Sequence, residues 1–177
     1  MQLHTYQQAA SATAVYPRHL RVLYPTLGLA GEVGELIEAL EDRDADGTVD
    51  PAVLIGEFGD VCWYIAALSA DLGVPLGGSG IHPTPDAVAA PLSSPSALAV
   101  TVGVIAEQVK KTVRDHQGNM PAARLRTVEG QLSRLLGQLT AAAAGCGLRL
   151  EDVLDANVAK LTSRKQRGQL HGDGNLR

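Results

Sequence analysis

Two acidic stretches, residues 29–41 and 54–64, with an apolar pattern that continues from the second to residue 72, constrain the fold of this chain more than any other feature of its sequence. In both stretches carboxylates and apolar residues recur three or four residues apart, which keeps like side chains on one face of an α-helix. The first carries Glu32, Glu35, Glu38 and Glu41 beside Leu29, Val33, Leu36, Ile37 and Leu40, and the second carries Glu57, Asp60 and Tyr64 beside Leu54, Phe58, Val61, Ile65, Leu68 and Leu72. The pattern predicts two helices whose carboxylates border the surface that packs.

Antiparallel packing of these two helices would bring four carboxylates face to face, those of Glu32, Glu35, Glu57 and Asp60. Two ionised carboxylates about 4 Å apart repel by about 4 kcal/mol at an effective dielectric constant of about 20. Either some of them keep a proton or a cation lies between them. Because every donor atom is an oxygen, the set suits Mg²⁺, with Mn²⁺ as a substitute, rather than zinc. The alternative is a solvated charge stripe, which is the favoured interpretation for Glu38 or Glu41 taken alone.

Three blocks of sequence that follow one another along the chain contain or accompany these acids. They are Tyr24-Pro-Thr-Leu-Gly-Leu-Ala-Gly-Glu-Val-Gly-Glu35, Gly56-Glu-Phe-Gly-Asp-Val-Cys-Trp-Tyr-Ile-Ala-Ala-Leu68 and Leu150-Glu-Asp-Val-Leu-Asp-Ala-Asn-Val-Ala-Lys-Leu-Thr-Ser-Arg-Lys-Gln-Arg-Gly168. Together with the paired motifs Glu32-x-x-Glu35 and Glu57-x-x-Asp60, they resemble the MazG-like family of all-α nucleoside triphosphate pyrophosphohydrolases.

The resemblance implies a Mg²⁺-dependent hydrolase that cleaves (d)NTPs, modified ones included, to the nucleoside monophosphate and pyrophosphate. It implies that Glu32, Glu35, Glu57 and Asp60 bind the metal. A carboxylate that is not fully used as a ligand, Glu35 or Glu38, would accept the proton of the attacking water. The sequence does not choose between these two catalytic candidates.

Several further polar residues are expected to contact the substrate. Asn157 and Lys160 match the family's Asn-x-x-Lys pair, and Lys160 shares a helix face with Arg164, so the two cations form a candidate phosphate-facing stripe. Lys165 is equally well explained as a cation favoured at a helix C-terminus. Tyr64 lies one turn after Asp60, where its ring could stack on a base.

Composition and chain order indicate one all-α domain over residues 1–177. Only six of the residues are aromatic and 45% are hydrophobic, which favours helices, and the net charge of −4 argues against nucleic-acid binding. The start lacks the pattern of a signal peptide, and no apolar run approaches the length of a membrane span, so a cytoplasmic protein is expected.

Helices are expected near 3–15, 26–43, 51–72, 97–116, 122–145 and 150–167, which makes an antiparallel bundle of five to six helices. A Pro- and Gly-rich linker is expected over 73–95, and a Gly-rich polar tail ends the chain.

The second half of the chain reads as a degenerate copy of the first. Residues 97–147 would repeat the hairpin 26–72, with Thr101, Val104, Gln131 and Arg134 in place of the four acids. In this pseudo-dimer the second hairpin would present Lys110, Lys111 and Arg114 to the substrate's phosphates, as the resemblance implies. A homodimer of such chains and an unrelated helical insertion are the alternatives.

Two other classes of protein were weighed against the enzyme. A non-catalytic nucleotide-binding or helical interaction module would keep this fold without needing the four acids. A di-iron carboxylate bundle would need Glu-x-x-His ligands, and no glutamate here has a histidine three residues later. The complete acidic set therefore favours the hydrolase.

Overall fold

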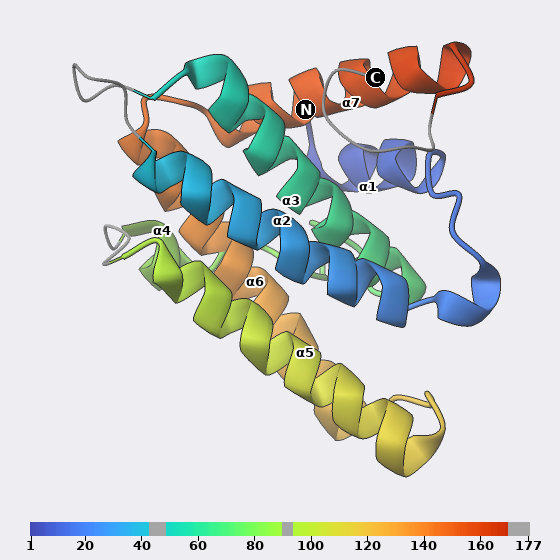
Figure 1. Cartoon of the computed structure of the whole chain (residues 1–177). Coiled ribbons are helices and arrows are strands. Elements are labelled where there is room, and N and C mark those ends of the chain that lie inside the picture. Colours follow the sequence, from blue (N-terminus) through green and yellow to red (C-terminus); the bar gives the residue numbers. More distant parts are fainter. Residues whose placement is uncertain (43–48, 90–93, 170–177) are drawn as a thin grey trace.

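The computed structural model describes residues 1–42, 49–89 and 94–169, and this part of the chain is all-helical (Figure 1). The helices are α1 (Leu3–Ser11), α2 (Leu23–Glu41), α3 (Pro51–Asp71), α4 (Pro85–Ala89), α5 (Ser96–His116), α6 (Ala122–Gly145) and α7 (Leu150–Gln166), and a 3-10 turn at Arg18–Leu20 precedes α2. The prediction of an all-α bundle is confirmed. The predicted end of the second helix near residue 43 and most of the predicted Gly-rich tail lie outside the described residues.

Two helical hairpins form the body of the bundle. The α2–α3 hairpin and the α5–α6 hairpin pack side by side, with α2 against α5 and α3 against α6. Helices α1 and α7 contact each other and cover α3 on the side away from α5, so that α5, α2, α3 and α7 follow one another across the molecule (Figure 1). This arrangement places the surface between α2 and α3 next to α7.

Helix α3 is the central helix, because α1, α2, α6 and α7 all contact it. Twelve of its 21 residues are buried. Among the described residues it is also the one helix long and apolar enough to cross a membrane, but 61% of its apolar window is buried inside the protein. Such burial is what the central helix of a soluble bundle shows.

The ends of the helices follow local sequence signals. Asp50 accepts a hydrogen bond from the backbone N–H of Ala52 at 2.8 Å, and Pro51 occupies the first helical position, as the sequence predicts for the start of α3. Helix α1 ends at Ser11 rather than near residue 15. Just beyond the helix end, Thr13 is buried and its hydroxyl accepts a hydrogen bond from Trp63 Nε1 at 2.9 Å.

The expected linker is largely packed where the structure describes it. Val74, Leu76 and Ile81 belong to the hydrophobic core, and α4 packs against α6. Proline at the first position of a helix loses no hydrogen bond, so Pro85 starts α4 instead of preventing it. This short helix makes seven α-helices in the described residues, where five to six were predicted.

The second hairpin holds a neutral hydrogen bond in its core. The Thr101 hydroxyl donates to Gln138 Oε1 at 2.9 Å, and both side chains are buried. Arg134 is exposed. Among the described residues, the one acidic group able to hold a metal lies in the first hairpin. The origin of the two hairpins by duplication stays a prediction.

Replacing Gly137 with alanine should test the packing of α4 on α6. A Cβ at Gly137 would lie 2.7 Å from the Cβ of Ala87 and 2.9 Å from the carbonyl oxygen of Thr84. Overpacking of this kind costs about 1–3 kcal/mol, so urea denaturation should show a less stable protein. Gly130→Ala in the same helix meets no atom within 4 Å and should gain up to about 1 kcal/mol from helix propensity. Equal stabilisation by both variants would contradict the placement of α4.

Candidate functional site

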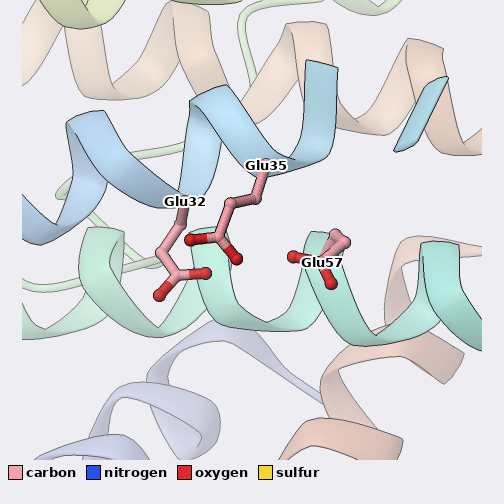
Figure 2. Close-up of side chains that lie close together, drawn as sticks. All are labelled: Glu32, Glu35 and Glu57. Atoms are coloured by element: carbon pink, nitrogen blue, oxygen red, sulfur yellow. The ribbon is translucent and has the colours of Figure 1, made fainter. Parts of the chain in front are cut away.

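Three carboxylates converge between α2 and α3. Glu32 and Glu35 extend from α2 toward Glu57 on α3 (Figure 2), and each residue offers an oxygen that lies within 4.8 Å of the other two. Glu57 is 7% exposed, whereas Glu32 is partly buried and Glu35 is exposed. These three residues, here called the acidic cluster, are the group that the two paired motifs predict. Three of the four acids therefore lie together as predicted, while their binding of a metal stays a prediction.

One carboxyl group of the acidic cluster, that of Glu32, has a shifted pKa. The pKa of Glu32 is raised to about 7, mainly by burial and further by the negative charges of Asp60, Glu35 and Glu57, while Lys160 lowers it. A carboxyl group with this pKa changes between its protonated and ionised forms near neutral pH. A cation that binds the cluster would favour the ionised form over the protonated one.

Asp60, the fourth predicted ligand, is paired with a cation of the protein itself. Lys160 Nζ donates to both carboxylate oxygens of Asp60 at 2.7 Å. Asn157 Nδ2 also donates to Asp60, at 3.1 Å. Since the charge of Asp60 raises the pKa of Glu32, Asp60 still lies near the acidic cluster. The sequence placed Lys160 beside the substrate, and the structure shows it at the edge of the same site.

The packing of α7 on α3 explains this pairing. Asn157 and Lys160 are one turn apart on α7 and therefore share a face, and that face meets Asp60. Arg164, another turn along, is only 5% exposed and belongs to the buried side of α7. Lys165 is exposed and donates to the carbonyl oxygen of Ala12 at 2.9 Å, which favours its structural interpretation.

Four aromatic rings contact one another in a row, and one of them, Tyr64, adjoins the acids. The Tyr16 ring stacks on Tyr24 with centroids 4.8 Å apart, and the Trp63 ring meets Tyr64 edge-on at 4.8 Å. The ring of Tyr64 occupies the space where a Cβ on Gly28 would be, so only glycine fits at that position of α2. Burial is the main cause that raises the pKa of Tyr64, and the charges of Glu32 and Asp60 contribute. Tyr64 therefore adjoins the acids as predicted.

Glu38 lies outside the acidic cluster. It is exposed on α2 one turn beyond Glu35 and is not a member of the group that converges with Glu57. Of the two candidates for accepting a proton, Glu35 is the one that the fold brings to the cluster.

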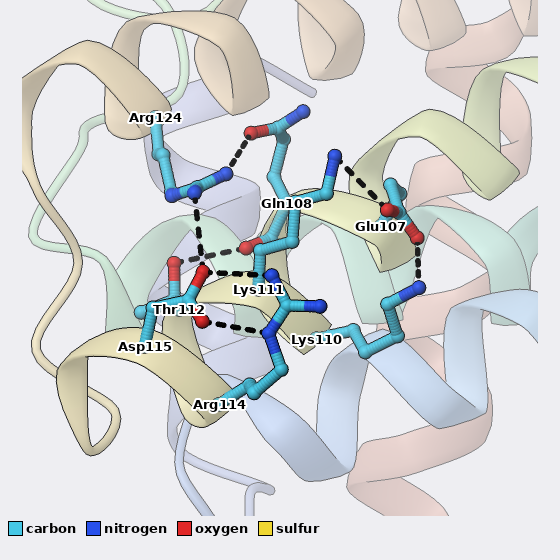
Figure 3. Close-up of polar contacts among 8 residues, drawn as sticks. All are labelled: Glu107, Gln108, Lys110, Lys111, Thr112, Arg114, Asp115 and Arg124. Carbon is cyan, nitrogen blue, oxygen red and sulfur yellow. Dashed lines mark hydrogen bonds and ion pairs between the residues drawn. The ribbon is translucent and has the colours of Figure 1, made fainter.

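The structure does not bring Lys110, Lys111 and Arg114 to the acidic cluster. Lys110 and Lys111 both form ion pairs with Glu107, and Arg114 pairs with Asp115 at 2.6 Å (Figure 3). Lys110 and Arg114 border a pocket of about 520 Å³ between α2 and α5, lined also by Leu23, Thr26, Leu27, Gly103, Ala106, Glu107, Val109 and Val113. At 3.6 residues per turn, Leu23 and Leu27 lie about 140–180° around the axis of α2 from Glu32. The expectation that these cations face the acids is therefore wrong in this structure, because α5 packs on the other side of α2.

Two residues near the site were missed from the sequence. Tyr6 on α1 is 1% exposed and donates to Asn157 Oδ1 at 2.8 Å. No role is assigned to it from the sequence, because one tyrosine in a short Ala-rich helix gives no functional signal. Tyr24, 41% exposed, lies within a block that resembles the family but was given no role.

Comparisons with known proteins found one informative relative. No family model matches the chain, and no solved structure matches it. The Gene 37 protein of Mycobacterium phage L5 is 39% identical over 85 residues, a match that covers 42% of this chain and 75% of the phage protein. The name of that relative states no activity. At this identity and coverage, the chain belongs to the same family as the phage L5 Gene 37 protein.

Proposed function

We propose that the chain is a cytoplasmic, Mg²⁺-dependent nucleoside triphosphate pyrophosphohydrolase of the MazG-like type, which cleaves (d)NTPs, modified ones included, to the monophosphate and pyrophosphate. The observation that carries this proposal is the convergence of Glu32, Glu35 and Glu57 between two antiparallel helices. A solvated charge stripe does not explain it, because Glu57 is almost fully buried and removing an ionised carboxylate from water is costly.

The donor set of the acidic cluster fits a hard divalent cation. All donor atoms are carboxylate oxygens, one of the three side chains is buried, and the neighbouring charges raise the pKa of Glu32. Mg²⁺ prefers such ligands and keeps several waters of its own. Glu32, Glu35 and Glu57 would hold the ion, with Asp60 beside them. When bound, Mg²⁺ would neutralise phosphate charge and acidify a water.

The remaining residues of the site have roles that follow from their positions. Glu35, exposed at the rim of the cluster, would accept the proton of the water that attacks the α-phosphorus, and pyrophosphate would leave with the electrons of the broken P–O bond. Lys160, which pairs with Asp60, would contact phosphates through a charge-assisted hydrogen bond. The rings of Tyr24 and Tyr64, 6.3 Å apart, offer a surface for the base.

One observation favours the alternative of a nucleotide-binding module without turnover. Lys160 donates to both carboxylate oxygens of Asp60 and neutralises its charge. If this pair stays closed when a nucleotide binds, the site would recognise phosphates without assembling a complete metal centre. Activity measurements on one pair of variants separate the two functions.

Glu57→Gln should abolish Mg²⁺-dependent release of pyrophosphate. The substitution keeps the shape of the buried side chain but removes a metal-binding charge, and a loss of several kcal/mol of transition-state stabilisation lowers the rate by more than about a hundredfold. Pyrophosphate and monophosphate would be quantified across a panel of ordinary and modified (d)NTPs. The matched control is Glu41→Gln, exposed on α2, which should retain activity within about twofold because it touches nothing in the cluster. Diphosphate and orthophosphate as products, or full activity of Glu57→Gln, would overturn the proposal.

The raised pKa of Glu32 predicts how pH and Mg²⁺ change stability. Between the ordinary value of 4.5 and the folded value of about 7, the folded state binds more protons than the unfolded one. The stabilisation from protonated Glu32 is complete below that window and is lost as pH rises through it. Mg²⁺ should therefore raise the melting temperature more at about pH 8 than at about pH 5.5.

The control for this experiment is Glu32→Gln, which keeps the side chain's size and removes its titration. Calorimetry of both proteins isolates the contribution of Glu32 from that of every other group. The metal-free wild type should lose more stability than Glu32→Gln between the two pH values. Identical pH profiles would show that Glu32 does not titrate in this window.

A further inference from the structure

A directed chain of hydrogen bonds links α1 to the acids of α3. The Tyr6 hydroxyl donates to Asn157 Oδ1 at 2.8 Å, and Asn157 Nδ2 donates to Asp60 Oδ1 at 3.1 Å. The Tyr6 hydroxyl is also 3.4 Å from the carbonyl oxygen of Gly59. Tyr6 and Asn157 are 1% and 2% exposed, so the hydrogen bond between them is shielded from solvent.

The donors and acceptors in this series of hydrogen bonds can be arranged in only one order. An ionised carboxylate accepts hydrogen bonds and donates none, so Asp60 requires the NH₂ group of Asn157. The amide oxygen must then point to Tyr6, whose hydroxyl has to be the donor. Rotation of the amide by 180° would set its oxygen against the carboxylate of Asp60, and two acceptors would repel. Asp60 therefore sets which end of the amide faces the site, and the Tyr6 hydroxyl supports that orientation by donating to the amide oxygen on the other side.

The Tyr6 hydroxyl keeps its proton and therefore remains a hydrogen-bond donor. Burial raises the pKa of its phenol well above the ordinary value, and the charge of Asp60 raises it further, so the proton remains on the oxygen. Asn157 is also confined sterically. A Cβ on Gly59 would lie 2.9 Å from Asn157 Nδ2, so the amide lies directly against the backbone of α3.

The docking of α1 does not depend on this hydroxyl. The neighbouring residue, Gln7, donates to the carbonyl oxygen of Val74 at 2.9 Å and accepts from the backbone N–H of Leu76 at 3.0 Å. These bonds tie α1 to the segment after α3. Removal of the Tyr6 oxygen alone leaves the ring in the core and these bonds in place.

We propose that Tyr6 is a positioning residue of the cation site, which orients Asn157 and thereby holds Asp60 next to the acidic cluster. This inference rests on the proposed function, because it gives Asp60 a part in cation binding. Partners that orient metal ligands without touching the ion change its affinity by about ten- to a hundredfold when removed.

Tyr6→Phe tests the role of this hydroxyl, and Tyr16→Phe is its matched control. Both substitutions delete one phenolic oxygen that donates to an Asn or Asp side chain, and the Tyr16 hydroxyl donates at 2.9 Å to Asp71, which is not part of the site. The affinity of each protein for Mn²⁺ alone would be measured by calorimetry and by paramagnetic resonance of the free ion. Tyr6→Phe should weaken Mn²⁺ binding about tenfold or more, and Tyr16→Phe should change it less than twofold.

Two further readouts separate positioning from a loss of structure. In the metal-free protein, the side-chain amide resonances of Asn157 should shift in Tyr6→Phe and stay unchanged in Tyr16→Phe. In an Asn157→Ala background, Tyr6→Phe should weaken Mn²⁺ binding no further, because its effect passes through the amide.

The failures of the two proposals look different. Equal Mn²⁺ affinities of the wild type and Tyr6→Phe, or equal losses in Tyr6→Phe and Tyr16→Phe, would overturn the role of Tyr6 and leave the proposed function standing. A wild-type chain that binds no Mn²⁺ would overturn the proposed function and this inference together.

Discussion

Repulsion between carboxylates at the α2–α3 contact is the constraint that the surrounding structure has to satisfy. Three of these groups have oxygens within 4.8 Å of one another, and a fourth lies at their edge. The protein neutralises only part of this charge. Lys160 from α7 pairs with Asp60, while the pKa of Glu32 stays raised. Without a cation, the repulsion between these carboxylates destabilises the packing of α2 on α3. The apolar contacts of α3 with its neighbours must therefore offset this repulsion.

Much of this site could be predicted from the sequence because its determinants are local. The three-residue spacing of acids beside an apolar seam places them at the edge of a helix contact, and antiparallel pairing of neighbouring helices then brings Glu32, Glu35 and Glu57 together. The cap at Asp50 and Pro51 likewise marks the start of α3 without any tertiary information. Six of the helices follow from such patterns.

The parts that were missed or misplaced depend on contacts between distant segments. The pairing of Asp60 with Lys160 and the role of Tyr6 require α7 and α1 to pack on the same side of α3, which no spacing within one helix reveals. Arg114 illustrates the opposite failure. The text around it resembles the family, but a resemblance does not say on which side of α2 the helix α5 packs, and here it packs away from the acids. The short helix α4 was missed because the Pro- and Gly-rich composition of residues 73–95 was interpreted as a linker, whereas Pro85 occupies the first position of a helix.

The most direct measurement is a crystal structure of the protein soaked in Mn²⁺, with the ion located by its anomalous scattering. A peak coordinated by carboxylate oxygens of Glu32, Glu35 and Glu57 is predicted, with the second hairpin empty because its core holds the neutral Thr101–Gln138 pair. A fully occupied Mn²⁺ elsewhere in the molecule, or no peak at the α2–α3 contact at saturating Mn²⁺, would contradict the account of this cluster as a metal centre.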